Sequence, residues 1–176
     1  SSKTISIITT VYVCLTVAIF LSLWLAGMPV FDAVNHAFSI AATGGFSSRN
    51  LSVGYFDSNL INVIVMFYMA IAAIHFGLIY AVFAFRSFKP LNNSVIKYYF
   101  GSIAVCSLLI MLSLLTKGGY DSVGKAAMDA SFTVVSYMST AGFAICDNSM
   151  WPWMAGVVLL FVSFQCGCSG STTGGL

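Results

Sequence analysis

Two segments that lie 97 positions apart carry nearly the same sequence, and each lies between two long apolar runs. The first places Asp32 and Ser39 before Thr43-Gly44-Gly45-Phe46, and the second places Asp129 and Ser136 before Thr140-Ala141-Gly142-Phe143. The repeated unit is therefore an apolar span, a short helix, a turn with glycine and a second apolar span. Irregular backbone at membrane depth is tolerated where it lines a polar path. The pattern indicates an all-helical membrane protein with pseudo-symmetric pore-loop repeats around an ion pathway.

The composition leaves no material for a water-facing surface. Hydrophobic residues make up 59% of the chain and charged residues 7%, with no glutamate at all, whereas soluble domains carry about 25% charged residues. The net charge of +2 and the lack of a basic stripe exclude nucleic acid as a partner. The lipid bilayer is the expected surrounding. Both ends of the sequence predict an internal portion of a longer polypeptide.

Four apolar runs are long enough to cross a hydrocarbon core of about 30 Å. They cover about 5–27, 59–85, 95–116 and 151–165. Two shorter stretches, about 30–42 and 122–139, are too short or too polar to cross and suit re-entrant pore helices. Asp32 and Asp129 are expected where these helices begin, which favours helix capping over a role in drawing cations to the pore.

The connections between the spans predict the orientation. Arg86, Lys89 and Lys97 lie between the second and third spans with no acid among them. The other side of the membrane carries a mixed set of charges. An unopposed basic loop belongs in the cytoplasm, so both Thr-x-Gly-Phe turns would face outward.

The residue types of the turn fit cation coordination. A cation that sheds its water needs other oxygens, and consecutive backbone carbonyls supply them when the backbone adopts dihedrals that glycine tolerates. The carboxyl end of a short helix aimed at the turn adds negative partial charge. An ordinary turn between helices could explain one such motif, but not its recurrence in the same context.

These motifs resemble the Trk/Ktr/HKT superfamily of potassium transporters, most closely its bacterial TrkH type. The segments 42–47 and 139–144 are similar to the selectivity-filter turns of the second and third repeats, with Asp147 and Trp151-Pro152 following the latter. The resemblance implies ion binding by Thr43, Gly44, Gly45, Phe46, Thr140, Ala141, Gly142 and Phe143. It also implies an intramembrane gate loop of Cys168, Ser169, Gly170, Ser171, Thr172, Thr173, Gly174 and Gly175.

The resemblance extends to the whole assembly. It implies four repeats in one chain, of which residues 1–90 would be one and residues 91–176 a second, truncated in its gate loop. It implies potassium as the transported ion, no cofactor in this chain, a homodimer, a cytosolic nucleotide-binding regulatory subunit and a place in the bacterial inner membrane as a multi-pass protein. The chain departs from the pattern at Gln165 and Cys166, where the family tends to have an apolar residue and glycine.

Other hypotheses stay open on sequence alone. Two copies of a two-repeat chain could form a channel. A rhomboid-like intramembrane serine protease would use Ser169 in Gly167-Cys168-Ser169-Gly170 with His75 as base, but it leaves the doubled turns unexplained, and no enzyme is expected. His75 is otherwise either a group facing an inner cavity or a hydrogen-bonded helix contact. His36 is expected to give buried polar support to the filter.

Overall fold

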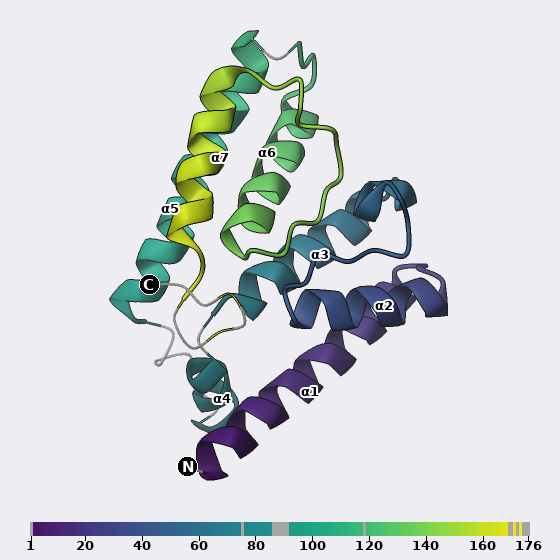
Figure 1. Cartoon of the computed structure of the whole chain (residues 1–176), viewed down its shortest axis with the longest axis vertical. Helices are drawn as coiled ribbons and strands as arrows, with labels where there is room; N and C mark the ends of the chain where they lie inside the picture. The colour runs from purple at the N-terminus through teal and green to yellow at the C-terminus, as the bar shows by residue number, and fades with distance from the viewer. Residues whose placement is uncertain are drawn as a thin grey trace.

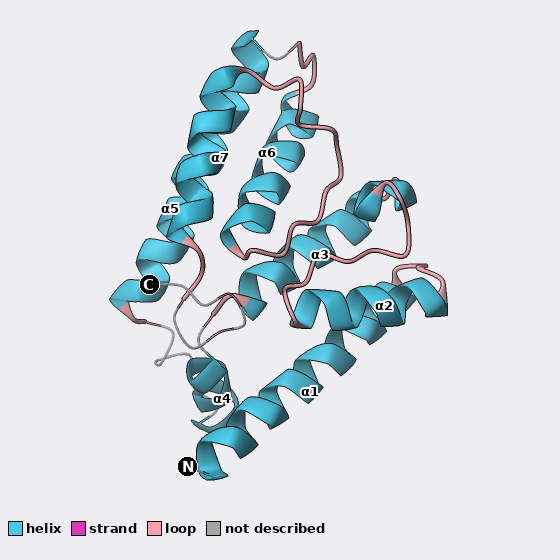
Figure 2. Ribbon diagram, viewed as in Figure 1, coloured by secondary structure: helices cyan, strands magenta, loops and turns pink. Residues whose placement is uncertain are grey.

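The computed structural model describes residues 2–74, 76–85, 92–117, 119–168, 171 and 173. Its regular elements are helices and short turns, with no strand among the residues described (Figure 2). The elements are α1 (Ser2–Leu25), α2 (Val30–Ala41), the 3-10 helix η1 (Ser52–Phe56), α3 (Asn59–Ala72), α4 (Phe76–Phe85), α5 (Ser94–Lys117), α6 (Val123–Met138) and α7 (Trp153–Gln165). The all-helical class predicted from the sequence is confirmed.

Two of the four predicted spans appear as single long helices. α1 and α5 are long and apolar enough to cross a membrane. The predicted span 59–85 is divided into α3 and α4, whose axes differ by 104°, so together they form a broken span or a re-entrant loop. The predicted last span is the apolar helix α7, with 13 residues. The sequence therefore places the apolar segments correctly, but it misses the bend, and α7 is shorter than the roughly 20 residues that one span needs.

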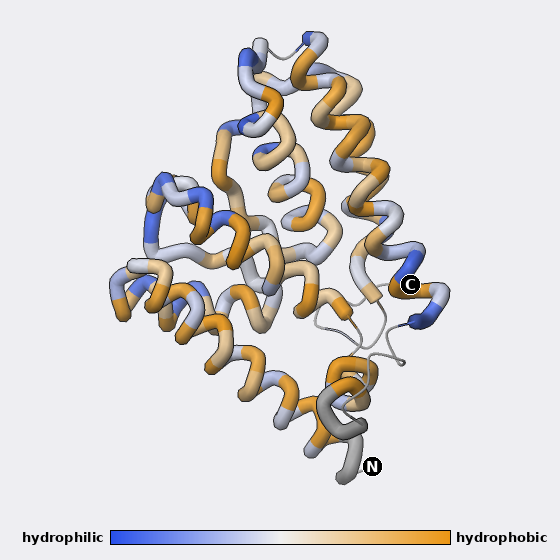
Figure 3. Tube along the Cα trace, turned by 180° about the vertical axis from the view of Figure 1, so that it is seen from behind, coloured by the Kyte–Doolittle hydropathy of each residue, from blue (hydrophilic) through white to orange (hydrophobic). Residues whose placement is uncertain are grey.

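The chain folds as two similar units (Figure 1). In the first, the short helix α2 packs along α1 and against α3; in the second, α6 packs against both α5 and α7, which also contact each other. Figure 3 shows hydrophobic residues along most of the long helices and the more hydrophilic residues mainly in the loops and at helix ends. Helices α2 and α6 match the two predicted pore helices to within about two residues.

Side chains from both units share one core. Phe132, Val135 and Phe143 of the second unit pack in the same buried cluster as Ile40 and Val65 of the first. Contacts between α3 and α6 connect the units as well. Because lipid tails are as apolar as these side chains, close packing rather than escape from water stabilises such an interface.

Local signals explain where the helices begin. Ser58 and Ser122 accept hydrogen bonds from the backbone N–H groups of Ile61 and Lys125 as N-caps of α3 and α6, which typically contributes about 1 kcal/mol each. Asp32 lies in the first turn of α2 as predicted, but the capping role predicted for the two aspartates is wrong. Pro29 occupies the N-cap of α2 with no side-chain cap bond. Asp129 lies near the middle of α6, because that helix starts at Val123.

Candidate ion-binding site

The two Thr-x-Gly-Phe turns have the same main-chain geometry. Thr43 and Gly45 have φ values of 49° and 70°, and Thr140 and Gly142 have 53° and 76°. The hydrogen bonds repeat too: the N–H of Thr43 donates to Ile40 O at 3.0 Å, and that of Thr140 donates to Tyr137 O at 3.1 Å. The sequence repeat is therefore a structural repeat.

Left-handed backbone at two threonines is costly. A β-branched residue at positive φ is a genuine outlier, and such a conformation costs about 1–3 kcal/mol per residue. Thr43 and Thr140 both adopt it, each two residues before a left-handed glycine. Strain that recurs at matched positions points to a function that requires this backbone shape.

Each turn lies at the carboxyl end of a pore helix. α2 ends at Ala41 and α6 at Met138, immediately before the turns. The last turn of each helix is closed by bonds such as Gly44 N–H to Ser39 O at 2.7 Å. The negative end of each helix dipole is thus placed beside its turn, where it favours a cation.

The two turns also touch each other. The Cα of Gly45 lies against the carbonyl oxygen of Ala141, where a Cβ atom would overlap that oxygen. Beyond the turns, the N–H of Gly54 donates to Ala144 O at 3.1 Å. The N–H of Ala144 in turn donates to Ser52 Oγ at 3.2 Å. The 3-10 helix of the first unit is therefore hydrogen-bonded, through both the N–H and the carbonyl oxygen of Ala144, to the segment that follows the second turn.

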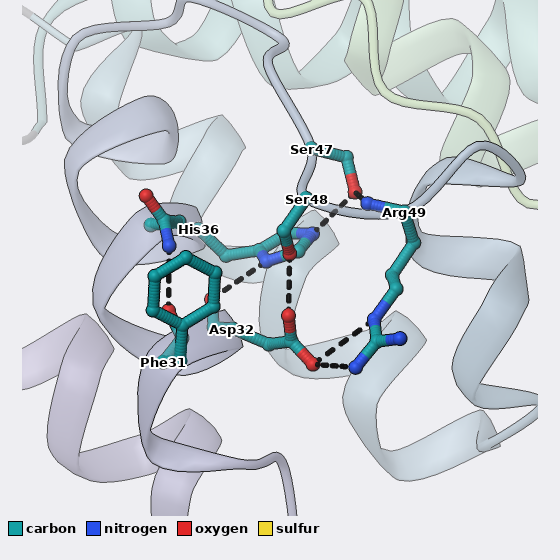
Figure 4. A network of polar contacts seen from close by, with 7 residues as sticks. Phe31, Asp32, His36, Ser47, Ser48 and Arg49 are labelled. Carbon is teal, nitrogen blue, oxygen red and sulfur yellow. Dashed lines mark hydrogen bonds and ion pairs between the residues drawn. The ribbon is translucent and has the colours of Figure 1, made fainter.

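Asp32 ties the first turn to its own pore helix (Figure 4). Its buried carboxylate accepts hydrogen bonds from the Ser48 hydroxyl at 2.5 Å and from Arg49 Nη2 at 2.8 Å. The Arg49 guanidinium, and next the Ser48 hydroxyl, lower the pKa of Asp32 below its ordinary value. Arg49 also lies over the Tyr55 ring, 4.5 Å from its centroid. The hydrogen bonds from Ser48 and Arg49 to Asp32 therefore hold the segment that follows the turn against α2, and we call this set of contacts the first strap.

A second strap of different chemistry lies in the other unit. The Tyr120 hydroxyl donates to Asp129 Oδ2 at 2.8 Å. Burial, followed by this hydrogen bond, raises the pKa of Tyr120. Cys146 corresponds to Arg49 in the repeat, and burial, followed by the nearby Asp129 charge, raises the pKa of its thiol to about 12. In the second unit the carboxylate thus bonds a hydroxyl from the segment before α6, whereas in the first unit it bonds a guanidinium from the segment after the turn.

Two pairs of matched residues behave differently in the two units. Ser136 Oγ donates to Phe143 O at 2.6 Å, whereas the buried hydroxyl of Ser39 has no partner among the described residues. Phe143 is 2% exposed, but Phe46 is 82% exposed. The second turn is thus packed against the first unit, and the first turn presents an open aromatic side chain.

The described part of the predicted gate loop docks on the break in the second span. The N–H of Cys168 donates to Ala73 O at 2.8 Å. Ser171 Oγ donates to Cys168 O at 2.7 Å and lies 2.7 Å from Thr173 Oγ1. Ala73 follows α3 directly, so this bond joins the end of the second unit to the bend in the first.

Several predicted residues lie outside the described part of the chain. They are His75, Arg86, Lys89, Ser169, Gly170, Thr172, Gly174 and Gly175. Lys97 lies in the first turn of α5. Among the residues described, no group of three or more metal-ligating side chains occurs.

Sequence reasoning missed the contacts between distant segments. The sequence shows Arg49 only as one charge among several. Its partner Asp32 is 17 positions away, so the ion pair between them could not be predicted from local sequence. Ala73 carries no polar side chain, so nothing marks its carbonyl as a docking point, although the nearby His75 and Gly77 interrupt the apolar run at this place.

Comparisons with known proteins agree with this geometry. A family described as "TrkH: Cation transport protein" matches residues 2–176. This chain is 41% and 42% identical to proteins called "Trk system potassium uptake protein TrkH" from Salmonella typhimurium and Vibrio parahaemolyticus. The matches cover 94% of this chain and 35% of each relative. The chain thus spans about a third of the length of these relatives.

A solved structure gives the same result. The crystal structure of the potassium transporter TrkH from Vibrio parahaemolyticus superposes with a TM-score of 0.92 at 38% identity, over 99% of this chain and 38% of that one. The likeness covers both pore-helix units and both turns. The chain belongs to the TrkH family of cation transport proteins.

Proposed function

We propose that this chain supplies two of the filter turns of a potassium uptake protein. Backbone carbonyls of Thr43–Phe46 and Thr140–Phe143 would replace the hydration water of the ion. The observation that carries the proposal is the matched left-handed backbone at Thr43 and Thr140, with a pore-helix carboxyl end beside each turn. The printed names of the relatives, potassium uptake proteins, support potassium as the ion.

Two turns make half of a coordination ring. An exposed side chain on the first turn and a hollow beside the second support the presence of further repeats on either side. Phe143 is buried against the first unit, whereas its counterpart Phe46 is exposed. A hollow of about 330 Å³ lies beside the second turn, and its lining includes Thr133, Ser136 and Tyr137. An aromatic side chain from a further repeat would fit there. Residues 1–90 and 91–176 would then be two of four repeats around one axis.

The remaining parts of the proposal follow from the same resemblance. The loop from Cys168 to Gly175 would gate the path below the filter, and the bond from Cys168 to Ala73 supports its place there. The turns would face outward, with the loop of Arg86, Lys89 and Lys97 in the cytoplasm of a bacterial cell. A homodimer with a cytosolic nucleotide-binding subunit would complete the assembly.

Growth rescue tests the function directly. The full-length protein carrying this sequence is expressed in a bacterium that lacks its own potassium uptake systems, and growth is followed at limiting potassium. We expect the wild-type protein to restore growth. The Gly45→Asp variant should fail to do so, because an added carboxylate would crowd the turn and trap the ion. Equal growth of the empty-vector strain and the wild-type strain, with the protein present in the membrane, would contradict the proposal.

A further inference from the structure

We propose that His36 is a positioning residue that holds the two filter turns in register with each other. This inference rests on the proposed function for its transport readout, but its geometry stands by itself. His36 lies on α2 with its side chain fully buried. It contacts the segment that leaves the first turn and an aromatic side chain of the second. One ring therefore links both turn segments, by a polar bond to the first and a ring contact to the second.

The hydrogen bonds of His36 determine its tautomer. Nδ1 lies 2.7 Å from the carbonyl oxygen of Asp32, which can only accept, so Nδ1 carries the proton. Nε2 lies 3.0 Å from Ser47 Oγ and, in the neutral ring, accepts from that hydroxyl. Ser47 Oγ also accepts from the N–H of Arg49 at 3.1 Å. The ring thereby fixes the segment immediately after Phe46 (Figure 4).

The ring faces complete the connection. The Phe143 ring is stacked on His36 with centroids 5.8 Å apart and planes 23° apart. The Phe56 ring meets it edge-on, at 5.6 Å and 79°. Phe143 ends the second turn, and Phe56 ends the 3-10 helix that clasps the chain beyond it. A shift of the His36 ring would therefore move both turns together.

The environment keeps the ring neutral. Burial lowers the pKa of His36, the Arg49 charge acts in the same direction, and the carbonyl and carboxylate of Asp32 oppose them. A charged ring would donate from both nitrogens, and the Ser47 hydroxyl would lose its acceptor. The corresponding position in the second unit is Thr133, so this arrangement occurs once in the pair.

Variants of His36 separate its local bond from its bridging contacts. His36→Asn retains a donor for the Asp32 carbonyl, as Asn35 donates to Phe31 O at 2.7 Å from the same helix. It loses the hydrogen bond to Ser47 and the stacking contact with the Phe143 ring. His36→Phe keeps the ring and loses the hydrogen bonds. Asn35→Ala is the matched control, because it removes one local bond of the same kind from an exposed side chain.

The first readout is the ratio of potassium to sodium uptake by the full-length protein in proteoliposomes. Removing one ordinary hydrogen bond changes an equilibrium by roughly fivefold. His36→Asn is expected to lower the ratio by at least that factor, and Ser47→Ala to lower it similarly. The double variant His36→Phe with Ser47→Ala is expected to match the worse single variant. Wild-type selectivity in His36→Asn, or additive losses in the double variant, would overturn the proposal.

A second readout does not need transport. The ¹⁵N chemical shifts of His36 in the purified wild-type protein report its tautomer and charge, and they do so even if a variant fails to fold. A neutral ring protonated on Nδ1 at neutral pH is the expected result. A charged ring, or a proton on Nε2, would overturn the proposal whatever the uptake data show. Failure of the wild-type protein to transport potassium would instead count against the proposed function alone.

Discussion

The Cα of Gly45 packs directly against the carbonyl oxygen of Ala141, so the backbones of the two Thr-x-Gly-Phe turns meet with no side chain between them. Glycine is required there for two independent reasons. Its φ of 70° is left-handed, and no Cβ fits beside the oxygen. Gly142, at the matching position, has a φ of 76°, but a methyl group added there would meet no described atom within 4 Å. The glycines of the two turns are therefore unequal.

Alanine at Gly45 should be far more damaging than alanine at Gly142. Gly142→Ala adds mainly left-handed strain of about 1–2 kcal/mol, whereas Gly45→Ala must also push the two turns apart. Growth at limiting potassium and thermal unfolding in detergent measure the difference. Gly44→Ala is the control, since Gly44 is not left-handed and its added methyl group would make only ordinary contact, 3.4 Å from the Phe46 ring. Equal phenotypes for Gly45→Ala and Gly44→Ala would contradict this account.

Gly167→Ala should weaken the contact between the segment at Cys168 and the bend at Ala73. A Cβ at Gly167 would lie 2.8 Å from Ala73 Cβ and 2.9 Å from Ala73 O, the oxygen that accepts from Cys168. Overpacking of this kind costs about 1–3 kcal/mol, so a clear drop in thermal stability is expected. Gly156→Ala, in the preceding helix α7, is the matched control, because its added methyl group would meet no described atom within 4 Å. The docking contact would be unimportant if both variants unfolded at the same temperature.

Cys166→Gly should stabilise the chain. Cys166 has a φ of 54° and a ψ of −170°, close to a region that is essentially restricted to glycine and costs other residues about 1–3 kcal/mol. Glycine also loses more entropy on folding, by about 0.5–1 kcal/mol, which leaves a net gain of about 1 kcal/mol. Thermal unfolding checks the value. Cys166→Ala, which keeps the strain, should show no gain, and a gain in Cys166→Ala equal to that in Cys166→Gly would refute the explanation.

The sequence predicted the helical segments because apolar length and turn residues are local properties. The pore helices α2 and α6 and the two turns were placed within about two residues. The 104° bend was not predicted, because Ala73 has neither proline nor glycine beside it and its partner, Cys168, is 95 positions away. The bond from Asp32 to Arg49 was missed for the same reason. It connects a helix to a loop through tertiary structure, and the matching position in the second unit is Cys146.

Acid should loosen the first strap. The pKa of Asp32 is lowered in the folded protein, chiefly by its hydrogen bond to Arg49 and then by the bond to Ser48. The folded state therefore binds this proton less readily than the unfolded state. Its contribution to stability is complete above the ordinary value of 3.8 and is lost as the pH falls through the lowered pKa.

Asp32→Asn tests this dependence. The variant is expected to be less stable than the wild-type protein near neutral pH, and the gap between their melting temperatures should narrow as the pH falls from 3.8 through the lowered pKa of Asp32. Asp57→Asn, which changes a carboxylate outside the strap, should leave the pH profile of the wild-type protein in place. A gap between wild type and Asp32→Asn that stays constant across this range would show that the ion pair with Arg49 does not stabilise the folded state.

Thallium is a heavy, strongly scattering substitute for potassium, and its position in crystals of the full-length protein tests most directly whether the paired turns bind the ion. An anomalous peak is expected on the axis between the turns, at coordination distance from main-chain oxygens of Thr43–Phe46 and Thr140–Phe143. That peak should weaken in the Gly45→Ala variant. A well-occupied thallium site elsewhere in the protein, with no peak between the two turns, would contradict this expectation.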